Sequence, residues 1–98
     1  METYAEQGWS SLINTLMAQG NYAMAVEMLR HRLTENPDDA NAHAYLAICL
    51  VDMRRVHAAE MEARTALVLD PGSSLGRFAL VSVCMVHRRL KEAESLLH

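Results

Sequence analysis

The chain has 98 residues, of which 51% are hydrophobic and 21% charged, and its formal net charge is -3 at pH 7. A chain of this length forms one domain, which we place at residues 1–98. Mixed charges with a small negative excess predict no nucleic-acid partner. The apolar runs are far shorter than the ~20 residues of a membrane-spanning helix, and the N-terminal residues do not resemble a signal peptide. We therefore expect a cytoplasmic protein without membrane insertion.

The apolar pattern predicts helices along the whole chain, with two prolines as the main boundaries. Pro37 and Pro71 stand 34 residues apart. Each closes a helix, because proline cannot continue a helix from inside it and disfavours helix in the residue before it. Alanines and leucines recur at the same interval. No segment indicates a strand, and we expect six helices, at residues 5–18, 22–35, 40–52, 56–69, 74–87 and 90–98.

The first 34-residue unit contains a motif of bulky and small residues at fixed spacings. Its members are Trp9, Leu12, Ile13, Leu16, Gly20, Tyr22, Ala25, Leu29 and Pro37. The motif resembles that of the tetratricopeptide repeat, W-x2-L-G-x2-Y followed by A-x3-F and P, with Ile13 at the place of a small residue. The second and third units repeat the pattern, with His43 and Arg77 at the place of the tryptophan.

This resemblance implies an all-α fold, a right-handed solenoid of three helix-turn-helix repeats. The repeats cover residues 6–39, 40–73 and 74–98, and the last is incomplete. A solenoid needs a polar cap at its end, which an incomplete last repeat does not supply. We therefore expect apolar residues to be exposed there, from the set Leu75, Phe78, Val83, Val86 and Leu90 to Leu97. Either the chain is a fragment of a longer protein, or copies of it associate in isolation.

The resemblance also implies a concave groove that binds a segment of another protein. In this family the groove is lined by the first helix of each repeat. The residues of this chain that we assign to it are Asn14, Met17, Asn41, Tyr45, Ile48, Val51, Leu75, Phe78, Ser82 and Met85. The groove is polar at one end and apolar at the other, which favours an apolar or amphipathic partner. The alternative is that a missing C-terminal helix or a second copy fills it.

One well-known use of the fold is disfavoured. Tetratricopeptide domains that bind the acidic tails of heat-shock chaperones hold them with Lys, Arg and Asn side chains. At those places the chain has Ser10, Asn14, Tyr45, Leu75 and Ala79, and only Asn14 matches. Without these cations the charge-assisted bonds to the tail cannot form. We expect no binding of such a tail.

Two arginine pairs recur at the repeat interval. Arg54 and Arg55 are followed 34 residues later by Arg88 and Arg89, where the family has the turn between its two helices. They are expected to form a basic edge of the solenoid. Cations after a helix C-terminus stabilise it by ~0.3–1 kcal/mol, which explains them structurally; the alternative is docking to an acidic partner.

The remaining reactive residue types indicate no enzyme. Cys49 and Cys84 lie on apolar faces and are expected to be small buried hydrophobes. The five histidines have no metal-ligand spacing, and no nucleophile, phosphate loop or acid–base pair is recognisable. We predict no catalytic residue, no metal and no cofactor. The leading hypothesis is a protein-binding scaffold or chaperone-like module, and the alternative is a structural self-association domain of a larger protein.

Overall fold

The structure is a computed structural model that describes residues 4–97, with side chains placed for residues 8–89 and 91. These residues form five α-helices and no strand. The helices are α1 (Tyr4–Ala18), α2 (Tyr22–Glu35), α3 (Ala40–Asp52), α4 (Val56–Leu69) and α5 (Ser74–Leu97). The all-α class is thus confirmed, and three predicted helices, at 22–35, 40–52 and 56–69, have the observed bounds.

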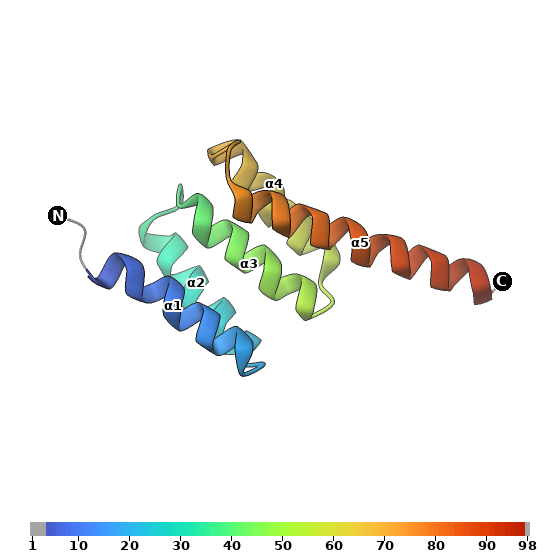
Figure 1. Cartoon of the computed structure of the whole chain (residues 1–98), viewed down its shortest axis with the longest axis horizontal. Helices are drawn as coiled ribbons and strands as arrows, with labels where there is room; N and C mark the ends of the chain where they lie inside the picture. The colour runs from blue at the N-terminus through green and yellow to red at the C-terminus, as the bar shows by residue number, and fades with distance from the viewer. Residues whose placement is uncertain (1–3, 98) are drawn as a thin grey trace.

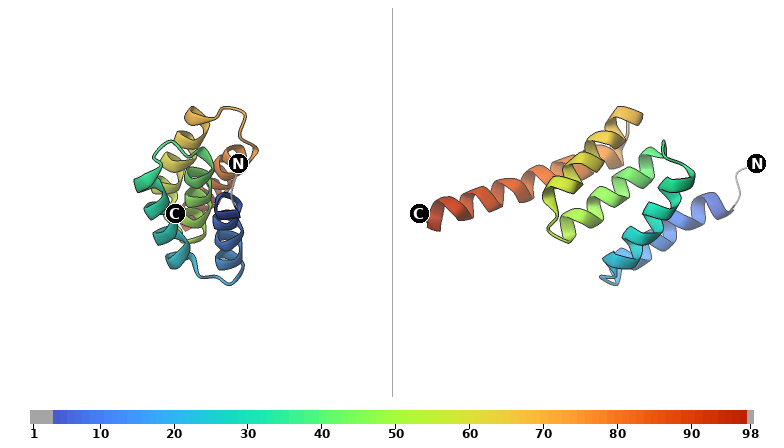
Figure 2. Two further views of the ribbon diagram at one scale, coloured as in Figure 1. Left: turned by 90° about the vertical axis from the view of Figure 1, so that its left-hand side faces the viewer. Right: turned by 180° about the vertical axis from the view of Figure 1, so that it is seen from behind.

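The helices are arranged in two layers. The odd-numbered helices α1, α3 and α5 face the viewer in Figure 1, and α2 and α4 come to the front in the view from behind in Figure 2. The helices α1 and α2 form one antiparallel hairpin and α3 and α4 the next (Figure 1). The molecule is elongated, with a longest dimension of 57 Å, because α5 extends well past its neighbours.

The two prolines lie in equivalent turns, as predicted: Pro37 between the two hairpins and Pro71 between the second hairpin and α5. The backbone N–H of Asp39 donates to the carbonyl of Asn36 in the first turn, and that of Ser73 donates to Asp70 in the second, again 34 residues on. Each turn ends in a side-chain cap. Asp39 Oδ1 accepts from the N–H of Ala42, and Ser73 Oγ accepts from that of Gly76, which satisfies donors that a helix N-terminus leaves unpaired.

The turns inside the two hairpins share another geometry, which requires one left-handed residue. After α1 the N–H groups of Gly20 and Asn21 donate to Met17 and Leu16, and those of Arg54 and Arg55 make the same pattern after α3. This pair of hydrogen bonds closes a helix when the first of the two donor residues has positive φ. Gly20 has φ 75° and Arg54 has φ 65°. Glycine adopts this conformation freely, whereas arginine does so at a cost.

The third hairpin predicted from the sequence does not form. Helix α5 runs unbroken from Ser74 to Leu97, so Arg88 and Arg89 lie inside a helix and the expected sixth helix is the continuation of the fifth. A turn there would force Arg88 into the left-handed region, and the residues that follow, Arg-Leu-Lys-Glu-Ala-Glu, are strong helix formers. In the second repeat α4 offsets the same cost by packing Ala59 and Ala63, both 0% exposed.

The core is built around small residues that recur in the two hairpins. The alanines at 25, 59, 63 and 66 on α2 and α4 are fully buried, as are those at 42, 44 and 47 on α3. They let the helices approach closely, and Ile13, Leu29, Leu46 and Leu50 fill the remaining space. Val83, which we expected at an exposed end, is only 2% exposed and belongs to this core. Leu75 and Val86 are half-buried, and Phe78 is exposed as expected.

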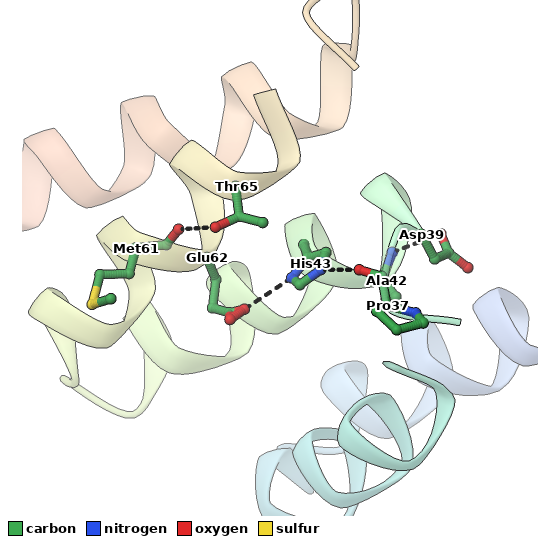
Figure 3. A network of polar contacts seen from close by, with 7 residues as sticks. All are labelled: Pro37, Asp39, Ala42, His43, Met61, Glu62 and Thr65. Atoms are coloured by element: carbon green, nitrogen blue, oxygen red, sulfur yellow. Dashed lines mark hydrogen bonds and ion pairs between the residues drawn. The ribbon is translucent and has the colours of Figure 1, made fainter. Parts of the chain in front are cut away.

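A histidine joins the second repeat to the turn before it. His43 stands at the place of the family tryptophan and is half-buried. Its Nε2 is 2.8 Å from the carbonyl oxygen of Pro37, and its Nδ1 is 3.0 Å from Glu62 Oε2 on α4 (Figure 3). The imidazole therefore connects the inter-repeat turn, α3 and α4 through polar contacts instead of the apolar packing of an indole.

Candidate partner-binding groove

Three stripes of residues face the same side of the layer formed by α1, α3 and α5. Residues three, four or seven positions apart share one face of a helix. On this basis the stripes are Ser10, Asn14 and Met17 on α1, Asn41, Tyr45 and Ile48 on α3, and Leu75, Phe78, Ser82 and Met85 on α5. Phe78 and Met85 are 59% and 54% exposed. Large apolar side chains in water on one stripe indicate a surface for interaction.

The first members of all three stripes meet in an open hollow of about 440 Å³. Its walls come from four helices and the turn before α3. The lining residues are Trp9, Ser10, Arg32, Asp39, Asn41, Tyr45 and Leu75. Of these, only Asn41, Tyr45 and Leu75 belong to the set predicted from the sequence. The hollow therefore includes three of the ten residues predicted for the groove.

Aromatic and amide contacts fix the wall between α1 and α3. The rings of Trp9 and Tyr45 pack edge to face, with centroids 5.7 Å apart and an interplanar angle of 83°. Asn14 Nδ2 is 3.4 Å from the Tyr45 hydroxyl, to which it donates. Both predicted residues, Asn14 and Tyr45, are thus brought together. Edge-to-face packing adds ~0.5–1.5 kcal/mol beyond area burial, so this contact stabilises the wall.

The cation in the hollow is engaged by the protein itself. Arg32 Nε donates to Asp39 Oδ2 at 2.7 Å, and the guanidinium carbon lies 4.3 Å from the centroid of the Trp9 ring. Asp39 also caps α3 through its other oxygen. Trp9, Arg32 and Asp39 were not among the site residues predicted from the sequence. The sequence signal that could have identified this ion pair is the spacing of seven residues between Arg32 and the capping Asp39, across the turn that contains Pro37.

Not every predicted groove residue lies at the surface. Val51 is 6% exposed and is part of the core, because the place it occupies on α3 turns inward towards α5. Met17 and Ile48 are half-buried and pack against core clusters, so they support the groove and expose only part of each side chain. Ser82 Oγ donates to the Phe78 carbonyl within α5, and Asn41 is exposed in the hollow.

The basic edge is divided between two kinds of structure. Arg54 and Arg55 occupy the turn after α3, whereas Arg88 and Arg89 are exposed residues inside α5. Stabilisation of a helix C-terminus therefore applies to the first pair only, since no helix ends at the second. Docking of an acidic partner at these arginines stays a prediction.

Both cysteines are free, and they differ in environment. Cys49 is buried in the core, and burial, with the nearby Asp52, raises its pKa to about 11. Cys84 is exposed, contrary to expectation. Asp52 also raises the pKa of Tyr22 above its ordinary value. Across the described residues no group of three or more His, Cys, Asp or Glu side chains could hold a metal ion, and none of the described helices is long and apolar enough to cross a membrane.

The fold and groove define a helical repeat protein in which successive hairpins stack side by side. Residues 16–63 match the family model of the tetratricopeptide repeat, from the end of α1 to the middle of α4. This match confirms the resemblance seen in the sequence, and residues 16–63 belong to the tetratricopeptide repeat family. Repeats of this family generally mediate contacts between proteins. A comparison with curated proteins gave no match.

Proposed function

We propose that the protein is a binding module that holds an amphipathic segment of another protein in its concave groove, as a scaffold or chaperone-like domain. The observation that carries this proposal is the open hollow of about 440 Å³ continued by the exposed Phe78 and Met85. A preformed hollow lined by aromatic and polar groups is typical of a recognition site. The two free thiols fit a reducing compartment such as the cytoplasm.

The chemistry of the walls defines the segment that fits. The α1 wall offers Ser10 and Asn14, which hydrogen-bond a polar face, and the α5 wall offers Phe78 and Met85 to an apolar face. A segment with both faces matches the groove. Because Arg32 is already paired with Asp39, the hollow has no strong preference for a carboxylate. An acidic chaperone tail is therefore excluded from the proposal.

The test is to select binding peptides from a random library and to measure their affinity for two variants. Phe78→Asp is expected to weaken binding about tenfold or more, since a buried aromatic contributes ~1.5–3 kcal/mol. Its unfolding is expected to change little, because Phe78 is largely exposed. The matched control is Met61→Asp on α4, where the side chain is 72% exposed.

Three outcomes contradict the proposal. The first is equal loss of affinity in both variants, which would show that charge and not position matters. The second is a library that returns only peptides indifferent to Phe78→Asp. The third is loss of stability in Phe78→Asp as large as its loss of affinity, because the residue would then belong to the core. In the same assay an acidic chaperone tail is expected to bind no better than its scrambled sequence.

A further inference from the structure

The outer face of α5 exposes residues whose counterparts are buried in the first two repeats. Val81 is 57% exposed and Cys84 is exposed. Thirty-four and sixty-eight residues earlier, the counterparts are Ala47 and Leu50, at 0% and 1%, and Ile13 and Leu16, at 1% and 9%. Equivalent positions are therefore covered by other residues in the first two repeats and are left uncovered on α5.

In those repeats the cover is the second helix of the same hairpin. Ala25 and Leu29 of α2 belong to one core cluster with Ile13 and Leu16 of α1, and Tyr22 packs against it. Val56 and Ala59 of α4 share that cluster with Leu50 of α3, and Ala63 of α4 shares a second cluster with Ala47. The chain carries a third set at the same interval, Leu90, Ala93 and Leu97. The residues suited to cover Val81 and Cys84 are therefore present in the sequence of α5 itself.

The unbroken helix keeps this segment away from its own face. At 1.5 Å per residue, residues 90–97 continue for roughly 12 Å in a straight line beyond Arg89, and Figure 1 shows this part of α5 clear of the other helices. A straight helix cannot fold back on itself. Within one copy, Val81 and Cys84 can be covered by residues 90–97 only if α5 breaks at the arginines.

We propose that a second copy of the chain provides the cover, and that the two copies exchange the C-terminal third of their α5 helices. Residues 90–97 of each copy lie antiparallel on the Val81 and Cys84 face of the other, as α4 lies on α3. Val81 borders the groove stripe on α5, three residues from Phe78, whereas Cys84 lies further round the helix. The proposal rests on these two residues and not on the proposed function. A closed pair of this kind has two-fold symmetry. Residues 88 and 89, where the first two repeats have a turn, stay helical and join the two parts of α5.

The second hairpin sets the register of the exchanged pair. There His43 on α3 contacts Glu62 on α4, and the corresponding contact in the pair is between residue 77 of one copy and residue 96 of the other. This register places the two-fold axis near His87. The arginines at 88 and 89 of both copies approach one another there, so the pair is expected to tighten when salt screens their repulsion.

The test is the mass of the chain in solution, measured by sedimentation between low and high micromolar concentration. The unaltered chain is expected to shift to twice its mass of 11.0 kDa. In a Cys49→Ala background, labelling of Cys84 by a thiol reagent is expected to slow over the same range, because the partner helix covers it. Replacing Arg88→Gly and Arg89→Asn together transplants the turn Gly20-Asn21 of the first repeat. This variant is expected to close its own hairpin and stay a monomer.

Two further variants make the test specific. Arg88→Gln with Arg89→Gln removes the same charge but keeps a good helix former, and it is expected to dimerise at least as well as the unaltered chain. Val81→Asp changes an exposed residue, and it is expected to be a folded monomer. A chain that is monomeric throughout overturns the proposal, whether α5 stays straight or closes. Dimerisation of the Gly-Asn variant overturns it too, as does dissociation by Phe78→Asp, which would place the interface in the groove.

Discussion

The left-handed turn between α3 and α4 should limit the stability of the molecule. Arg54 has φ 65°, a region that costs an L-residue roughly 1–2 kcal/mol. Glycine removes this cost but loses ~0.5–1 kcal/mol through its freer unfolded state. We therefore expect Arg54→Gly to exceed Arg54→Ala in free energy of unfolding by about 0.5–1 kcal/mol, or in Tm by several degrees for a domain of this size.

The charge of Arg54 must be separated from its backbone conformation. The guanidinium follows the C-terminus of α3 and is favourable to it by ~0.3–1 kcal/mol. Arg54→Ala removes the same charge and keeps a Cβ, so the difference between the Gly and Ala variants isolates the backbone. Urea unfolding followed by circular dichroism, in a Val81→Asp background to avoid association, measures both. Equal stability of the two variants would refute the strain argument.

The remaining predictions concern groups buried to different extents. Thiol reagents should modify Cys84 of the dilute folded chain quickly and Cys49 only on unfolding, and equal rates would contradict the packing of α3. Because the pKa of Cys49 is raised to about 11, its proton is held more tightly by the folded state. Stability from this group is present below the ordinary value of ~8.5 and lost as the pH rises towards 11, a dependence that Cys49→Ala should remove. His43→Ala should lower the free energy of unfolding by about 2 kcal/mol or more, since it leaves the Pro37 carbonyl and Glu62 without their partner. The control, exposed His57→Ala, should have little effect.

The repeat period was sufficient to predict most of the fold. Proline boundaries and recurring alanines fixed α2, α3 and α4 to the residue, because both act through local backbone geometry and close helix packing. The absence of a turn at Arg88 could not be predicted in the same way. It depends on whether packing of the following segment offsets the cost of a left-handed arginine, and that balance differs between Arg54 and Arg88 although their neighbours in sequence are alike.

The candidate site was predicted in part for a related reason. Tyr45, Phe78 and Met85 could be assigned from their positions on the first helix of each repeat, since the face on which a helical residue lies depends only on helical periodicity. The rest of the hollow was not predicted, because Arg32 and Asp39 reach it from the end of α2 and the turn before α3, which helical periodicity does not bring together. The burial of Val51 was not predicted, because its position within the repeat faces inward in this molecule, towards the core that includes Val83.

The most direct test of the binding groove is a map of the residues that respond when a selected peptide is titrated into the isotope-labelled protein. Resonance changes are expected along the groove, at Tyr45, Ile48, Phe78 and Met85, with the Trp9 indole responding as the hollow fills. Val68, which is 80% exposed at the end of α4, is expected to stay unchanged. Changes confined to α2 and α4, with Tyr45 and Phe78 silent, would contradict the assignment of the groove.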